Sequence, residues 1–221
     1  MKLSFSNQQT TALTRMDVVV VVAVVVVLAF LAISLLPEEG GNKRRPRQVN
    51  CIYNLKQTGI AFRLWEGDNN DKYPMAVSVT NGGAMELIAT GNVAACFRVM
   101  SNELNTPRIL LCPEDTRRTC ATNFSTGFSG ANISYFVNPD AVEAHPQMIL
   151  DGDDNLTVGG VRVRPGILNL WTNAAVGWTK ERHHGEGNIG MADGSVQQST
   201  TDGLRQVLQQ TGVTTNRLAI P

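Results

Sequence analysis

The sequence predicts an α+β fold in which a long hydrophobic N-terminal helix is followed by a helix packed on an antiparallel sheet. Three features of the 221-residue chain predict it: a continuous apolar run near its start, an amphipathic segment over residues 49–74, and short alternating runs beyond residue 104. The roughly 180 residues that remain after the apolar run suffice for one globular domain. We therefore expect a single α+β domain over residues 49–221.

The apolar run extends from Val18 to Leu36 and predicts a membrane-spanning helix, because its length matches the hydrocarbon core of a bilayer. It lacks the short core and the small-x-small cleavage site of a secretory signal peptide. Asp17 stands at its start, where a carboxylate beside hydrocarbon is costly and marks a partner cation. We expect a helix over residues 13–36 and a basic, Pro- and Gly-containing linker over residues 37–48.

The letters ALTRMD, followed by this apolar run, resemble the N-terminus of type IV pilins and of the pseudopilins of type II secretion systems. The resemblance implies that prepilin peptidase removes a leader of residues 1–12 after Ala12 and that Leu13 becomes the methylated N-terminus. It also implies that Asp17 is the acidic residue of the family, which pairs with the Leu13 amine of a neighbouring subunit. Such pairing offsets the cost of burying both charges. Arg15 departs from the family, which is apolar at that position.

Two further blocks resemble a group of prepilin-like proteins from planctomycetes and verrucomicrobia. The first is C-x-x-NLKQ-x-G-x-A, which lies in the amphipathic segment where Leu55 and Phe62 share a helical face. The second is an H-x9-DG motif that runs from His183 to Asp193 and Gly194. The combined resemblance implies a pilin-like fold for the chain.

The remaining sequence predicts short elements. Residues 84–104 contain two short helical patterns, AMELIATG and VAACFRVMSNEL. The runs ILLCPEDT, ISYFVN, MILDGD, GVRVRPGILNL and NIGMADGSVQQS are typical of antiparallel strands and turns. The Asp193-Gly194 pair predicts a type I′ hairpin turn, and TTDGLRQVLQQTG predicts a C-terminal helix.

His183, His184, Glu186 and Asp193 are the candidate metal-ligating or catalytic side chains. Imidazole and carboxylate groups suit zinc, but adjacent histidines in a glycine-rich loop lack the fixed i, i+4 spacing of a helical metal motif. We favour a structural role, in which one histidine donates a hydrogen bond to the neighbouring hairpin and Asp193 is a residue of the hairpin turn. Metal or ligand binding and catalysis are the alternatives, and no metal is assigned. The segment DGDDN (151–155) indicates a solvated turn, with a calcium site as the alternative.

Four cysteines, an even number, follow the apolar run and suggest disulfides in an exported domain. We favour a bridge between Cys112 and Cys120, which closes a short loop, and regard Cys51 with Cys96 as the second pair. Free buried thiols are the alternative, because Cys51 and Cys96 lie on apolar helical faces.

The formal net charge of zero argues against a nucleic-acid partner. With the resemblance, the sequence predicts a non-enzymatic structural subunit of a type II secretion pseudopilus or type IV pilus-like filament. Its partners would be prepilin peptidase, other pilin-like subunits and the inner membrane. We expect a single-pass protein of the bacterial inner membrane, with its C-terminal domain periplasmic or in an extracellular filament. A non-polymerising, membrane-anchored binding module for polysaccharide or protein is the alternative, and an exported enzyme is the third class.

Overall fold

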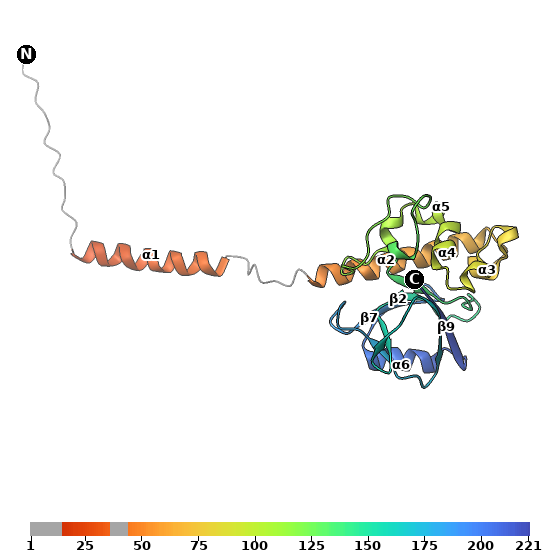
Figure 1. Cartoon of the computed structure of the whole chain (residues 1–221). Coiled ribbons are helices and arrows are strands. Elements are labelled where there is room, and N and C mark those ends of the chain that lie inside the picture. Colours follow the sequence, from red (N-terminus) through yellow and green to blue (C-terminus); the bar gives the residue numbers. More distant parts are fainter. Residues whose placement is uncertain (1–14, 36–43) are drawn as a thin grey trace, which may run out of the picture. The chain divides into compact units, whose positions relative to one another are not determined.

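The computed structural model describes residues 15–35 and 44–221, with side chains described for residues 15–31 and 49–221 (Figure 1). The chain divides into two compact units, Met1–Lys43 and Arg44–Pro221. The predicted processing residues Ala12 and Leu13 lie outside the described residues.

The first unit contains helix α1 (Arg15–Leu35), which includes Asp17 in its first turn. Among the helices whose side chains the structure describes, none has the length and hydrophobicity needed to cross a membrane. The predicted transmembrane helix over residues 13–36, and the single-pass inner-membrane localisation with it, are therefore wrong.

The second unit begins with helix α2 (Arg44–Gly67), which starts inside the predicted linker. Its buried face includes Leu55 and Phe62, as the amphipathic pattern predicts. The helix ends at Gly67, at the start of the segment GDNND, in which Asn70 and Asp71 adopt positive φ angles that a helix cannot contain.

Short helices follow α2 and pack around it. They are η1 (Pro74–Ala76), η2 (Val79–Asn81), α3 (Met85–Ile88), α4 (Val93–Val99), α5 (Ser101–Leu104), η3 (Pro107–Leu110) and η4 (Gly130–Asn132). Helix α4 begins where the side chain of Asn92 accepts a hydrogen bond from the backbone N–H of Ala95 at 3.1 Å. The predicted strand ILLCPEDT is wrong, since its residues form η3 and the loop that follows it.

The strands form two antiparallel sheets instead of one. The large sheet has the order β5 (Gly166–Trp171), β9 (Thr215–Ile220), β1 (Tyr135–Val137), β2 (Ile149–Asp153), β7 (Gly187–Met191), β8 (Val196–Ser199). The small sheet has the order β4 (Val161–Arg162), β3 (Leu156–Val158), β6 (Val176–Trp178). This six-stranded sheet with a second sheet, and the absence of a membrane-length apolar helix among the described side chains, contradict the predicted pilin-like fold.

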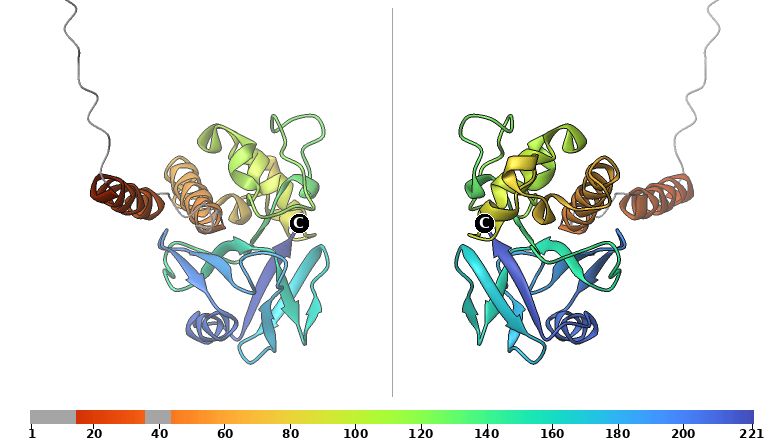
Figure 2. Two further views of the ribbon diagram at one scale, coloured as in Figure 1. Left: turned by 90° about the vertical axis from the view of Figure 1, so that its left-hand side faces the viewer. Right: turned by 90° about the vertical axis from the view of Figure 1, so that its right-hand side faces the viewer.

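The central strands β1, β2 and β7 of the large sheet are buried on both faces, while its edge strands β5 and β8 are partly exposed. On one face α2 packs against β2, β7 and β8, and on the other face lie α6 (Thr201–Gln210) and residues of the small sheet (Figure 2). Neighbouring strand residues accordingly belong to different cores: Val137 joins the α2 core and Phe136 joins the α6 core. Strands between two apolar layers have no solvent face, so polar residues on β2 and β7 are forced into the interior.

Candidate functional site

Buried polar residues gather where α2, the loop after η3, the end of β2 and the β6–β7 loop meet. The segment Asp151 to Asn155, predicted to be a solvated turn, is completely buried, because most of it is strand β2 in the centre of the large sheet. Its three carboxylates have separate partners and do not converge on one position: Asp151 contacts Thr58, Asp153 contacts Asn188 and His183, and Asp154 contacts two arginines.

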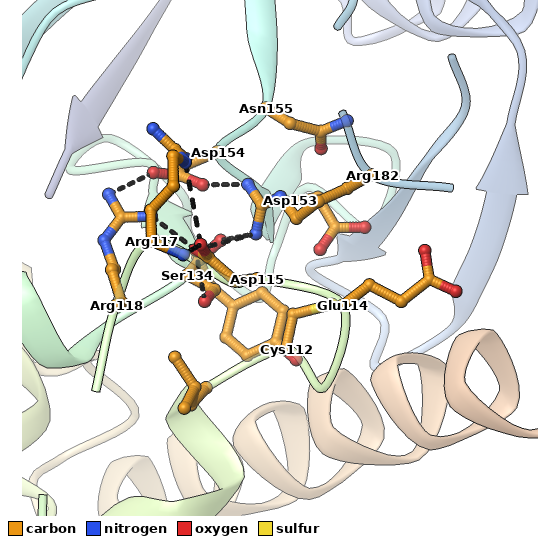
Figure 3. Close-up of polar contacts among 12 residues, drawn as sticks. Cys112, Glu114, Asp115, Arg117, Arg118, Ser134, Asp153, Asp154, Asn155 and Arg182 are labelled. Atoms are coloured by element: carbon orange, nitrogen blue, oxygen red, sulfur yellow. Dashed lines mark hydrogen bonds and ion pairs between the residues drawn. The ribbon is translucent and has the colours of Figure 1, made fainter. Parts of the chain in front are cut away.

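The first group is an Asp–Arg cluster of Asp115, Arg118, Ser134, Asp154 and Arg182 (Figure 3). Arg182 pairs with Asp154, and it also lies 3.4 Å from Asp115 Oδ2. Arg118 donates to the same Asp115 oxygen at 2.8 Å and pairs with Asp154 as well. Two arginines and two aspartates thus form the buried part of this cluster, in which Arg118 is 12% exposed. Arg117, 40% exposed, also lies 3.6 Å from Asp115 Oδ1.

Burial and ion pairing oppose each other in the Asp–Arg cluster. Burial alone would raise the pKa of Asp115, but Arg182, Arg118 and the hydroxyl of Ser134 lower that pKa to about 2. Burial likewise lowers the pKa of Arg182, and the carboxylates of Asp154, Asp153 and Asp115 outweigh it, so its pKa is raised. Asp115 and Arg182 are therefore charged at neutral pH.

The second group is a Cys–His cluster of Cys51, Cys112, Glu114, Asp153 and His183. Cys51 on α2 forms a disulfide with Cys112 in the loop after η3, and their Cα atoms are 5.3 Å apart. The imidazole Nε2 of His183 lies 3.4 Å from Cys112 Sγ and 3.4 Å from Asp153 Oδ2. Its Nδ1 lies 3.2 Å from Glu114 Oε2.

The predicted Cys112–Cys120 bridge is therefore wrong, and so is the second predicted pair of Cys51 with Cys96. Cys112 faces the interior beside α2, whereas Cys120 is exposed, so the short loop between them does not bring their sulfur atoms together. Cys96 is free and buried, and burial raises the pKa of its thiol. The alternative of free buried thiols thus holds for Cys96, while Cys120 is free and exposed.

The backbone at His183 is held in an unusual conformation. His183, His184 and Gly185 adopt successive positive φ angles of 50°, 58° and 89°. A positive φ costs a side-chain-bearing residue about 1 kcal/mol or more. The N–H of His183 donates to Glu114 Oε2 at 2.8 Å, so one carboxylate oxygen lies against both the backbone and the ring of the histidine.

The structure separates the two ends of the H-x9-DG motif. His183 lies in the Cys–His cluster, while Asp193 is exposed in the β7–β8 turn and accepts a hydrogen bond from the N–H of Ser195 at 2.8 Å. The hairpin is present, with Gly190 opposite Val196, but its turn is not type I′ because Gly194 has a positive φ (80°) and Asp193 does not. The expected hydrogen bond from His183 to this hairpin is replaced by its contacts with Glu114, Cys112 and Asp153.

Asp151 forms a third buried polar contact, between β2 and α2. The hydroxyl of Thr58 donates to Leu55 O at 2.8 Å and also lies within hydrogen-bond distance of Asp151 Oδ2. The hydroxyl donates to Asp151 Oδ2, which lowers the pKa of that carboxyl. Burial outweighs this contact and raises the pKa of Asp151 to about 7. A Cβ on Gly190 would lie only 2.0 Å from Asp151 Oδ1, so this glycine makes room for the carboxyl.

Asn54, the first residue of the NLKQ block, also contacts this region of buried polar residues. Its side-chain amide donates to Leu111 O at 3.2 Å and to the hydroxyl of Tyr135 at 3.3 Å. It therefore ties α2 to the loop that carries Cys112 and to strand β1.

Sequence reasoning missed Asp115, Glu114, Arg118 and Arg182. One signal could have indicated them: three aspartates within the strand-like run MILDGDD require cationic or hydrogen-bonding partners elsewhere in the chain once that strand is buried.

Among the side chains that the structure describes, Cys51, Cys112 and His183 form a group with the spacing of metal ligands. No protein family, no curated protein and no solved structure matches this chain. The assignment of a function therefore rests on the chain's own residues and geometry.

Proposed function

We propose that this protein is a non-enzymatic structural subunit of a pilus-like filament, in which the α1 helices of several copies pack against one another. The observation that carries the proposal is the character of α1. From Val18 to Leu31 its side chains are apolar on every side of the helix, without a polar face. Its valines are exposed within the chain, for example Val19 at 63% and Val22 at 55%.

A helix that is apolar all round is stable only when it is buried on all sides. Burying a valine side chain contributes about 1.5 kcal/mol or more, so even partial coverage of the α1 valines provides a large driving force for association. Identical helices from other copies supply a matching apolar surface. The resemblance of the N-terminal residues to pilins and pseudopilins supports the choice of other copies of this chain as the partners of α1.

The same resemblance supports processing by prepilin peptidase between Ala12 and Leu13. Such a cut creates an amine four residues before Asp17, which stands in the first turn of α1. In the proposed filament the Asp17 carboxylate pairs with the Leu13 amine of the adjacent copy. Pairing reduces the cost of enclosing two charges among apolar helices.

The second unit supports a structural role because most of the side chains in its polar clusters are buried and paired with one another. The side chains of His183 and Asp153 are fully buried, and those of Arg182 and Asp154 are 2% and 3% exposed. Their ion pairs and the Cys51–Cys112 disulfide join α2, the loop after η3, the end of β2 and the β6–β7 loop.

Cysteine crosslinking tests the proposal. The exposed thiol is first removed by Cys120→Ser, and Val22→Cys is then introduced in α1. A matched control carries Val161→Cys, an exposed valine (72%) in β4 of the second unit. A short bismaleimide crosslinker should produce covalent dimers of the Val22→Cys chain and not of the Val161→Cys chain.

Equal crosslinking of both variants would indicate random collision, and no crosslinking of either would show that α1 does not self-associate. The second result would favour the non-polymerising binding module over the filament subunit.

A further inference from the structure

The Cys–His cluster contains ligand atoms of a kind and spacing that a disulfide alone does not require. One ligand atom from each of Cys51, Cys112 and His183 lies within 4.8 Å of the others, and all three residues are buried. We propose that these residues, with Asp153, form a redox-gated zinc site. It binds Zn²⁺ when the Cys51–Cys112 disulfide is reduced and releases the ion when the disulfide forms.

The distances around His183 fit a tetrahedral zinc. Zinc bonds of about 2.0 Å to nitrogen or oxygen and 2.3 Å to sulfur place neighbouring ligand atoms about 3.3 to 3.7 Å apart. His183 Nε2 lies 3.4 Å from Cys112 Sγ and 3.4 Å from Asp153 Oδ2, so each of these two contacts has the spacing of neighbouring zinc ligands. Asp153 Oδ2 also accepts hydrogen bonds from the backbone and side chain of Asn188, at 2.7 and 2.8 Å, and a small shift of this side chain would bring it to the ion. Cys51 is the fourth ligand, and its Cα lies 5.3 Å from that of Cys112, near enough for both thiolates to reach the same metal.

The surroundings of these ligands resemble the outer shell of a metal site. A zinc-bound histidine typically has a carboxylate at its other ring nitrogen, which fixes the tautomer and the ring orientation. Glu114 Oε2 occupies this position, 3.2 Å from His183 Nδ1, and also accepts the backbone N–H of His183. Asp153 Oδ1 is buried and has no hydrogen-bond partner. A bound metal ion or an ordered water would supply one.

Glu114 also connects the buried ligands to the surface. It lines an open pocket of about 380 Å³ together with Asp115, Thr116, Arg117, Glu181 and Arg182. Rotation of its side chain, which is 13% exposed, would open a path from this pocket to the imidazole.

The electron and proton balance of the switch is simple. A dithiol reductant transfers two electrons and two protons to the Cys51–Cys112 disulfide and becomes a disulfide itself. Zn²⁺ then displaces one proton from each thiol to solvent and binds two thiolates, the neutral imidazole and the Asp153 carboxylate. In the reverse step a disulfide oxidant accepts two electrons from the two thiolates and two protons from solvent, and becomes a dithiol. The Cys51–Cys112 disulfide forms again, both sulfur ligands are lost, and the ion is released.

The test compares the oxidised and the dithiothreitol-reduced full chain. Each is incubated with Zn²⁺, freed of excess metal by gel filtration and analysed for bound zinc. We expect one ion per reduced chain and none per oxidised chain. Iodoacetamide should then modify the exposed thiol of Cys120, while peptide mapping should show Cys51 and Cys112 protected by zinc.

Substitutions locate the site. His183→Ala should abolish stoichiometric binding by the reduced chain, and the neighbouring His184→Ala should not. Glu114→Gln should weaken zinc binding about 10- to 100-fold, the usual effect of removing an outer-shell carboxylate. Glu181→Gln is the matched control, because Glu181 lines the same pocket without contacting His183.

A reduced wild-type chain that takes up no zinc overturns the proposal, whether or not it keeps its fold. Equal zinc in the oxidised chain, or protection of Cys96 and Cys120 in place of Cys51 and Cys112, overturns it as well. These outcomes need no variant and are independent of filament assembly.

Discussion

Replacing the buried Arg182 by methionine should strongly destabilise the second unit. Methionine keeps an unbranched side chain of similar length but removes the guanidinium group that pairs with Asp154 and Asp115 and donates to Ser134 O at 3.3 Å. The two carboxylates then share Arg118 as their remaining cation in the Asp–Arg cluster. Removing one partner from a buried ion pair costs about 3–5 kcal/mol, and we expect a loss in that range for Arg182→Met.

Urea unfolding followed by tryptophan fluorescence measures this loss, since Trp65 and Trp178 are both buried in the second unit. Arg217→Met is the matched control. Arg217 also pairs with an aspartate, Asp140, but both side chains are about 40% exposed, and an exposed pair contributes at most about 1 kcal/mol. Equal, small losses in the two variants would refute the idea that the Asp–Arg cluster stabilises the fold.

Three further predictions concern other parts of the chain. Because burial raises the pKa of Asp151 from its ordinary 3.8 to about 7, its contribution to stability is complete below about pH 3.8 and is lost as the pH rises through 7. The loss is at most about 4 kcal/mol, and Asp151→Asn should flatten this limb of a stability–pH curve measured by urea unfolding. An unchanged slope between about pH 3.8 and 7 would show that Asp151 is ionised in the folded chain. Gly190→Ala should lower stability by about 1–3 kcal/mol, because its Cβ would lie 2.0 Å from Asp151 Oδ1. Gly67→Ala, whose Cβ would meet no atom within 4 Å, should not lower it, and similar melting temperatures for the two variants would disprove the steric argument. Intact-mass analysis should find a mature chain that begins at Leu13, and a chain that retains Met1 would contradict processing.

Local periodicity was sufficient to predict elements whose burial is determined by near neighbours. Leu55 and Phe62 predicted α2, and Leu204, Val207 and Leu208 form the buried face of α6. The start of α2 was harder to predict, because Arg44 to Arg47 lie in the basic segment that was expected to be a linker.

Contacts between distant residues could not be predicted from spacing. Arg182 reaches Asp115 across 67 positions, and Cys51 reaches Cys112 across 61. A short loop between two cysteines favours a bridge only when both face the same side, and exposed Cys120 does not face buried Cys112. The division of the strands into two sheets likewise depends on long-range pairing, such as β1 with β9. The spacing of residues along the chain does not indicate these distant partners.

Self-association of α1 is the central claim, and sedimentation of the full chain tests it most directly. An aspartate in the middle of α1, introduced by Val22→Asp, would place a charge in the proposed helix–helix contact, where burial costs several kcal/mol. Val161→Asp places the same charge on an exposed valine of the second unit. We predict that the wild-type chain and Val161→Asp sediment as large assemblies while Val22→Asp sediments as a monomer. A monomeric wild-type chain, or assemblies that survive Val22→Asp unchanged, would contradict the account.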